Sequence, residues 1–133
     1  MAFELDYRLA GDSVLLKHLD LCQLRLMNDS RWPWLILVPM RENVSELFEL
    51  SPGDQLLLSQ EAGSVGEKLK KFTGCVKINV AAIGNIVRQL HVHIIARNEG
   101  DANWPGPVWG HGQRVPYNES ELQQLSEKLA DVY

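Results

Sequence analysis

The sequence predicts an α+β domain in which an antiparallel sheet packs against two main helices. Three observations support this prediction: several apolar segments have the length of β-strands, two longer segments carry apolar residues at helical spacing, and short turns separate the strands. Because short links favour antiparallel pairing of successive strands, we expect a meander with the helices packed on one face.

The first two predicted strands form a hairpin. Residues 21–27 alternate between apolar and polar side chains, as a half-buried strand does. A cluster of turn residues at 28–31 follows, and an apolar run over residues 34–38 then ends at Pro39. The unbroken apolar run predicts a central strand of the sheet.

A long helix is predicted to begin at residues 51–54, Ser-Pro-Gly-Asp. The serine fits the N-cap, the proline the first helical position, and the aspartate the third position, where its carboxylate can bond back to the cap. Gly63 and Gly66 each weaken this helix by roughly 1 kcal/mol relative to alanine. Gly74 is its predicted end. Its apolar stripe consists of Leu58, Ala62, Val65, Leu69 and Phe72.

The rest of the chain predicts two further strands, a loop and a final helix. Residues 75–80 and 88–97 are expected to be strands, with Gly84–Asn85 as the turn between them. Residues 98–117 are rich in glycine, proline and tryptophan, which predicts a loop. Asn118 opens the final helix, whose apolar side consists of Leu122, Leu125, Leu129 and Val132.

The length and charge of the chain narrow the possible functions. A chain of 133 residues is expected to form one domain over residues 1–133. Its net charge of −4 argues against general nucleic-acid binding, although a local site can still attract a small anion. No apolar run approaches the ~20 residues of a membrane span, and we expect a cytoplasmic protein. Cys22 and Cys75 are expected to be reduced, buried thiols, with a disulfide as the open alternative.

Two histidines that lie two residues apart mark residues 88–97 as the candidate site. Side chains alternate between the faces of a strand, so one face is expected to carry Gln89, His91, His93, Ile95 and Arg97. The other face is wholly apolar and is expected to belong to the core. Two imidazoles on a rigid element suit nucleophilic or acid–base chemistry near neutral pH.

Residues 89–95, Gln-Leu-His-Val-His-Ile-Ile, resemble the signature of the histidine triad (HIT) family, His-x-His-x-His-x-x with apolar residues at x. The resemblance covers roughly residues 20–100 and includes the Gly84–Asn85 pair. Residues 104–110 are similar to the tail of bacterial members described as diadenosine tetraphosphate hydrolase-like. The resemblance implies a HIT-like α+β fold, usually a homodimer, that binds nucleoside phosphates.

The resemblance implies nucleotide hydrolase or nucleotidyl transferase chemistry at His91, which matches the middle histidine of the signature. In the family this histidine attacks the α-phosphate and forms a nucleotidyl-histidine, which water or another acceptor resolves. A neutral imidazole can do this because one ring nitrogen carries a lone pair while the other donates its proton to a fixed acceptor. This scheme needs no metal and no cofactor.

The resemblance also implies which residues contact the nucleotide. Backbone N–H groups of Gly84 and Asn85, together with the imidazole of His93, are expected to hold the phosphate. Asn28 matches a family position that bonds the ribose hydroxyls. Asn79 matches a position at which relatives often have a polar residue that contacts phosphate.

The sequence departs from the family pattern within the expected catalytic group of His91, His93 and Gln89. Gln89 replaces the first histidine, and a glutamine can orient a neighbour but cannot shuttle a proton. Ile86 stands where many members have Ser or Thr near the leaving group. A leaving group that needs little protonation is therefore favoured, such as that of a dinucleoside polyphosphate or a nucleotidyl ester.

Two other functions are compatible with the same residues. The protein can be a nucleotide-binding module with little or no catalysis, because Gln89 and Ile86 remove acid chemistry. Alternatively, His91 and His93 can be ordinary sheet histidines or supply two metal ligands. Residues that could complete such a metal site, although no spacing favours them, are Cys22, Cys75 and His111.

Structural interpretations are also open for the other candidate residues. As alternatives to their nucleotide contacts, Asn28 and the Gly84–Asn85 pair can be ordinary turn residues, and His111 is expected at the surface. Trp104 and Trp109 can wall a base pocket, pack across a dimer interface or anchor the long loop.

Overall fold

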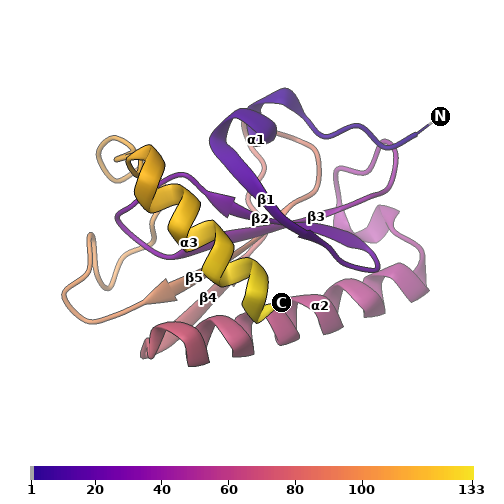
Figure 1. Cartoon of the computed structure of the whole chain (residues 1–133). Helices are drawn as coiled ribbons and strands as arrows, with labels where there is room; N and C mark the ends of the chain where they lie inside the picture. The colour runs from indigo at the N-terminus through magenta and orange to yellow at the C-terminus, as the bar shows by residue number, and fades with distance from the viewer. Residues whose placement is uncertain (1) are drawn as a thin grey trace.

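A computed structural model describes residues 2–133, which form a five-stranded antiparallel sheet with two main helices (Figure 1). The predicted α+β class is therefore confirmed. The elements in chain order are α1 (Tyr7–Asp12), β1 (Ser13–His18), β2 (Cys22–Met27), β3 (Trp34–Pro39), the short 3-10 helix η1 (Leu47–Glu49), α2 (Pro52–Thr73), β4 (Lys77–Ala81), β5 (Val92–Arg97) and α3 (Glu119–Val132).

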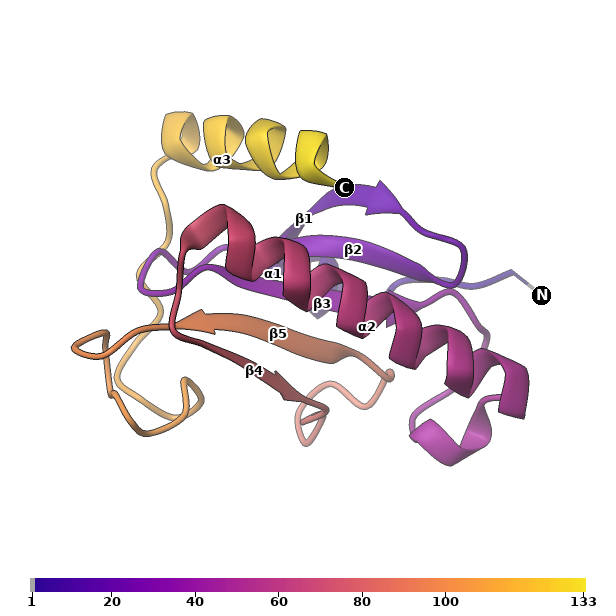
Figure 2. The same ribbon diagram turned by 90° about the horizontal axis from the view of Figure 1, so that it is seen from below.

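The strands lie in the order β1-β2-β3-β5-β4, and every neighbouring pair is antiparallel. The first three strands form a meander. The chain then crosses the sheet through α2 and returns as the edge strand β4 before β5 fills the space between β3 and β4 (Figure 2). As a result, the histidine strand β5 lies inside the sheet, where a neighbour on each side holds it rigidly.

The two faces of the sheet pack against different parts of the chain. One face forms the larger apolar cluster with α2 and α3, and it includes the expected core residues of β5, Val92, Ile94 and Ala96. The other face forms a second cluster with α1 and the 108–109 region of the C-terminal loop. The alternation predicted for the histidine strand is therefore confirmed over residues 92–97, and His93 lies on the second face.

Helix α2 begins and ends as predicted. The Ser51 side chain accepts a hydrogen bond from the Asp54 N–H at 3.1 Å, and Gly74 adopts a left-handed conformation with a φ of 69°. A Cβ atom at Gly66 would lie 3.4 Å from the Ile78 side chain, so glycine lets α2 approach β4 closely.

A buried carboxylate that the sequence did not reveal ties α2 to β2. Glu61 accepts hydrogen bonds from the backbone N–H groups of Leu21 and Cys22 at 2.9 and 3.1 Å. Burial, together with this carboxylate, raises the pKa of the Cys22 thiol. Both Cys22 and Cys75 are free, buried thiols, as expected.

The structure adds α1 and β1, for which the sequence carries no predictive pattern. Strand β1 is an edge strand whose pairing with β2 shifts register between Leu15 and Lys17, and this irregularity breaks the two-residue alternation. Helix α1 has only six residues, too few for an apolar stripe. Within residues 2–133, none of the helices has both the length and the apolarity needed to cross a membrane.

The predicted tight turn at Gly84–Asn85 is wrong. Strand β4 ends at Ala81 and β5 begins at Val92, so an irregular connection spans residues 82–91. Contacts outside the sheet replace strand pairing there: the Leu90 N–H donates to the Val44 carbonyl at 2.9 Å. His91 therefore lies immediately before the strand, not within it.

Candidate active site

His91 and His93 line a cavity of about 550 Å³ on the face of the sheet opposite α2. The walls come from three parts of the chain: the α1 and β2–β3 region, the connection at residues 83–87, and the C-terminal loop at residues 108–114. The cavity is partly apolar, with a charged group at residues 29 and 31. This size and composition are typical of a small-molecule site.

The geometry around His91 fixes its tautomer. Nδ1 lies 2.7 Å from the backbone carbonyl oxygen of Gln89, and because a carbonyl can only accept, Nδ1 carries the proton. Nε2 therefore has the lone pair, and no other residue within 2–133 forms a hydrogen bond with it. Burial lowers the pKa of His91, so the imidazole is neutral near pH 7.

His93 uses both ring nitrogens within the protein. The Trp34 Nε1–H donates to Nδ1 at 3.0 Å, which places the proton on Nε2, from where it is donated to the Ile83 carbonyl at 3.2 Å. Burial and the neighbouring His91 lower the pKa of His93 to about 4. His93 thus has no free lone pair for a metal, and no metal-binding group of three or more His, Cys, Asp or Glu residues occurs within 2–133.

Gln89, the replacement for the first histidine, contacts the N-terminal segment instead of the cavity. Its Oε1 accepts a hydrogen bond from the Asp6 N–H, and its Nε2 donates to the Glu4 carbonyl, both at 2.8 Å. Both ends of its carboxamide are therefore bonded to the N-terminal segment, while its backbone carbonyl accepts a hydrogen bond from His91.

The segment that contains Gly84 and Asn85 supplies free backbone donors beside His91. Gly84, Asn85 and Val87 form no hydrogen bonds within residues 2–133, and Asn85 and Val87 line the cavity. A Cβ atom at Gly84 would lie 2.6 Å from the Val87 carbonyl oxygen and 3.7 Å from Cε1 of His91. Only glycine fits this close approach.

Asn28 and Asn79, the two asparagines predicted to contact the nucleotide, are not among the residues that line the cavity. Asn28 accepts a hydrogen bond from the Tyr117 N–H at 2.9 Å, and Asn79 accepts one from Arg97 Nη1 at 3.2 Å. Both side chains thus support the C-terminal part of the chain in this structure, and their roles toward a nucleotide stay predictions.

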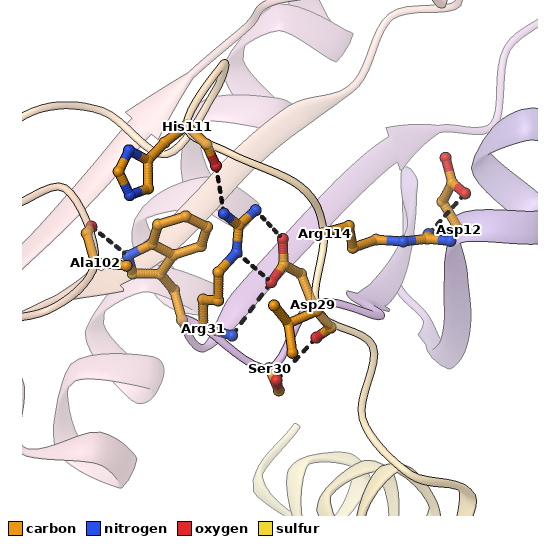
Figure 3. A network of polar contacts seen from close by, with 9 residues as sticks. Asp12, Asp29, Ser30, Arg31, Ala102, His111 and Arg114 are labelled. Carbon is orange, nitrogen blue, oxygen red and sulfur yellow. Dashed lines mark hydrogen bonds and ion pairs between the residues drawn. The ribbon is translucent and has the colours of Figure 1, made fainter.

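A charged group that also lines the cavity was not predicted (Figure 3). The buried carboxylate of Asp29 pairs with Arg31 at 2.8 Å, and Arg31 also donates to the His111 carbonyl. Burial opposes ionisation of Asp29, but the hydrogen bonds from Arg31 outweigh it and lower the pKa of this carboxyl. Arg114 pairs with Asp12 at 2.8 Å. The polar turn at residues 28–31 was the one sequence signal near this group.

The structure separates the roles of the two tryptophans in the C-terminal loop. Trp109 lines the cavity and packs edge-to-face on His93 and Trp34, with ring centroids 5.0 and 6.2 Å apart. Trp104 instead packs against the guanidinium of Arg97 at 5.6 Å. Trp109 therefore belongs to the site and Trp104 anchors the loop.

Comparison with known proteins assigns the chain to a family. Its sequence matches the HIT domain over residues 9–100, and the chain belongs to the HIT family, whose members bind nucleotides and are generally nucleotide hydrolases or transferases. No curated protein matches it.

Several solved structures are similar over nearly the whole chain. A histidine triad protein from Sinorhizobium meliloti 1021 is 55% identical with a TM-score of 0.95, covering 98% of this chain and 97% of that protein. Another from Marinobacter aquaeolei VT8 is 43% identical with a TM-score of 0.96, covering 99% and 96%. A third, from Bradyrhizobium japonicum, is 41% identical with a TM-score of 0.94, covering 98% of each.

Proposed function

We propose that this protein is a nucleotide hydrolase or nucleotidyl transferase in which His91 Nε2 attacks the α-phosphate of a nucleoside or dinucleoside polyphosphate. The observation that carries this proposal is the hydrogen bond from His91 Nδ1 to the Gln89 carbonyl, which leaves a lone pair on Nε2 of a residue that lines the cavity. A nucleophile held in this way meets the requirement for covalent catalysis.

The proposed reaction has two steps. In the first, an Nε2–P bond forms, the bond from phosphorus to the leaving-group oxygen breaks, and the polyphosphate leaves with the electron pair. The positive charge gained by the imidazole is stabilised through the Nδ1–H and the Gln89 carbonyl. In the second, water or another acceptor attacks phosphorus and loses its proton to solvent, the N–P bond breaks and His91 regains its lone pair.

Phosphate binding is assigned to the backbone N–H groups of Gly84 and Asn85, which form no hydrogen bonds within residues 2–133 and are therefore available to an anion. His93 supports the site as a neutral imidazole held by Trp34. For Asn28 and Asn79, the proposed contacts with ribose and phosphate require their side chains to leave Tyr117 and Arg97.

The residues expected near the leaving group, Ile86 and Gln89, favour substrates whose leaving group departs without taking up a proton. Ile86 lines the cavity with an apolar side chain, and the carboxamide of Gln89 is engaged elsewhere. A polyphosphate departs readily as an anion, whereas an amine does not. Diadenosine tetraphosphate is therefore our preferred test substrate.

The absence of acid chemistry at Ile86 and Gln89 also favours a second candidate function, a nucleotide-binding module with little or no catalysis. Because neither Ile86 nor the carboxamide of Gln89 can protonate a leaving group, the cavity can hold a nucleotide whose bond to the leaving group stays intact. Saturable nucleotide binding without release of product would distinguish this module from an enzyme.

We further propose that two copies form a homodimer in the cytoplasm. Strand β4 is an edge of the sheet, and its exposed Val80 lines one apolar hollow together with two other exposed side chains, Leu47 and Leu56. Such a surface is typical of a contact with another chain. The two free thiols are typical of a reducing compartment.

The decisive experiment measures nucleotide release from diadenosine tetraphosphate together with intact mass. We expect the wild-type protein to release nucleotide and to carry an adenylyl adduct, and His91→Ala to lose both while remaining folded. His18→Ala, at an exposed histidine on β1, is the matched control and should behave as wild type. Full turnover by His91→Ala would overturn the proposal.

A further inference from the structure

The N-terminal strap, residues 2–8, lies against the segment that carries His91. Phe3 and Leu5 pack against the apolar cluster on the site's face of the sheet. The Asp6 side chain caps α1 through the Arg8 N–H at 2.8 Å and also pairs with the Arg8 guanidinium at 3.0 Å. The strap is therefore a fixed part of the fold.

Gln89 binds this strap as a neighbouring strand would. Its carboxamide accepts from the Asp6 N–H and donates to the Glu4 carbonyl, so the two bonds lie on either side of Leu5. A carboxamide offers one donor and one acceptor in a single plane, which matches a peptide backbone. An imidazole also has one donor and one acceptor, but its two ring nitrogens point in diverging directions, so it matches a peptide backbone poorly.

The backbone carbonyl of the same residue orients the nucleophile, but no strand pairing fixes it. Residues 82–91 lie outside the sheet, and the Gln89 carbonyl accepts the His91 Nδ1–H at 2.7 Å. Two neighbouring contacts help to hold this carbonyl: the Leu90 N–H, which shares a planar peptide unit with it, donates to the Val44 carbonyl at 2.9 Å, and Arg8 of the strap donates to the Ile86 carbonyl at 3.2 Å. Two anchors therefore position this carbonyl: the Leu90–Val44 bond within its own peptide unit, and the hydrogen bonds of the Gln89 side chain to the strap on the other side.

We propose that Gln89 is a positioning residue: its carboxamide binds the N-terminal strap and, together with the Leu90–Val44 bond, fixes the carbonyl that sets the tautomer and direction of His91. The effect on catalysis rests on the proposed function, whereas the effect on the tautomer does not. On this basis glutamine at the first position of the motif is an adaptation to the strap, and Gln89→His should weaken the site.

The test compares Gln89→Leu, which loses both bonds, with Gln89→Glu, which keeps the acceptor for Asp6 but loses the donor to Glu4. Gln55→Leu is the matched control, because Gln55 Nε2 also donates to a backbone carbonyl, that of Leu50 at 3.0 Å. The readouts are the single-turnover rate of adduct formation with diadenosine tetraphosphate, its binding affinity, and the imidazole tautomers by ¹⁵N NMR.

We expect Gln89→Leu to slow adduct formation roughly 10- to 100-fold, because small misplacements of a reacting group cost this much, with affinity changed less than about threefold. His91 should lose its single tautomer while His93, held by Trp34, keeps its own. Gln89→Glu should fall between Gln89→Leu and wild type, and Gln55→Leu should match wild type.

A wild-type rate and an unchanged His91 tautomer in Gln89→Leu would overturn the proposal. So would a loss of the His93 tautomer as well, since that indicates general loosening of the site. If the wild-type protein forms no adduct, the proposed function fails, and the His91 tautomer alone decides the role of Gln89. If Gln89→Leu does not fold, Gln89→Glu decides it through the same readouts.

Discussion

A single residue, His93, makes the site sensitive to acid. Its Nδ1 lone pair accepts the Trp34 hydrogen bond, so protonation there would both break this bond and bury a charge. Burial, with a contribution from His91, lowers the pKa of His93 to about 4 from the ordinary 6.5. The folded protein therefore resists a proton that the unfolded chain takes up readily.

We predict that the low pKa of His93 makes the folded protein less stable as the pH falls. Below pH 6.5 the unfolded chain binds the proton first, so the free energy of unfolding should fall between pH 6.5 and about 4. The full loss is on the order of 3 kcal/mol. Urea unfolding across this range should show a flatter profile for His93→Gln, whereas the exposed His18→Gln should follow wild type. Equal slopes in His93→Gln and wild type would contradict the prediction.

Two glycines give opposite predictions for the same substitution. Gly84→Ala places a Cβ 2.6 Å from a backbone oxygen, so we expect it to displace the 83–87 segment and weaken nucleotide binding roughly tenfold or more. At Gly63 nothing lies within 4 Å of the new Cβ, and alanine should stabilise α2 by up to about 1 kcal/mol. Nucleotide titration and urea unfolding of both variants check this pair. Normal binding by Gly84→Ala would show that the segment does not depend on this glycine.

At the scale of elements, Glu61 joins the middle of α2 to the start of β2. Its carboxylate accepts from two backbone N–H groups, at Leu21 and Cys22, and both donors are buried. Removal of the carboxylate leaves these donors without partners, which costs far more than the net value of a hydrogen bond.

We predict that Glu61→Leu lowers the free energy of unfolding by about 2–4 kcal/mol, since two buried donors lose their acceptor. Glu61→Gln keeps one acceptor oxygen and should lose less. Glu67→Gln, on the exposed face of the same helix, is the control and should change stability by less than about 0.5 kcal/mol. Urea unfolding measures all three, and equal effects of Glu61→Leu and Glu67→Gln would refute the assignment.

At the scale of the whole molecule, the apolar surface beside β4 predicts self-association. Val80 is 55% exposed on the edge strand, and an aspartate there should convert a dimer into monomers by burying a charge in the contact. Val115→Asp is the matched control, because Val115 is 49% exposed but lies in the C-terminal loop. Sedimentation analysis distinguishes the two states, and a monomeric wild-type protein would exclude the homodimer.

The C-terminal loop shows how one buried residue connects distant parts of the molecule. Arg97, at the end of β5, pairs with Asp101 at 2.8 Å and donates to Asn79 on β4. It also packs against Trp104 in the loop. The following residues then bring Trp109 onto His93. The loop at residues 98–117, for which the sequence predicts no regular structure, is thus fixed by contacts with Arg97 at the end of the histidine strand.

Local patterns in the sequence determined the elements with regular periodicity. The cap and apolar stripe of α2 and the alternation within residues 92–97 were read correctly because they depend on neighbours along the chain. The motif around His91 likewise indicated the HIT family, which the comparisons show. The short α1 and the irregular β1 carry no such pattern and were missed.

Only the tertiary structure decided how these residues meet. The bond from Gln89 to residues 4 and 6, the place of His111 and Arg114 beside the cavity, and the separate roles of Trp104 and Trp109 all join segments far apart in the sequence. The long connection at residues 82–91 is also set by contacts with Val44 and Arg8, not by its own turn residues. Periodicity reports which face a side chain takes, whereas its partner across space depends on how the whole chain packs.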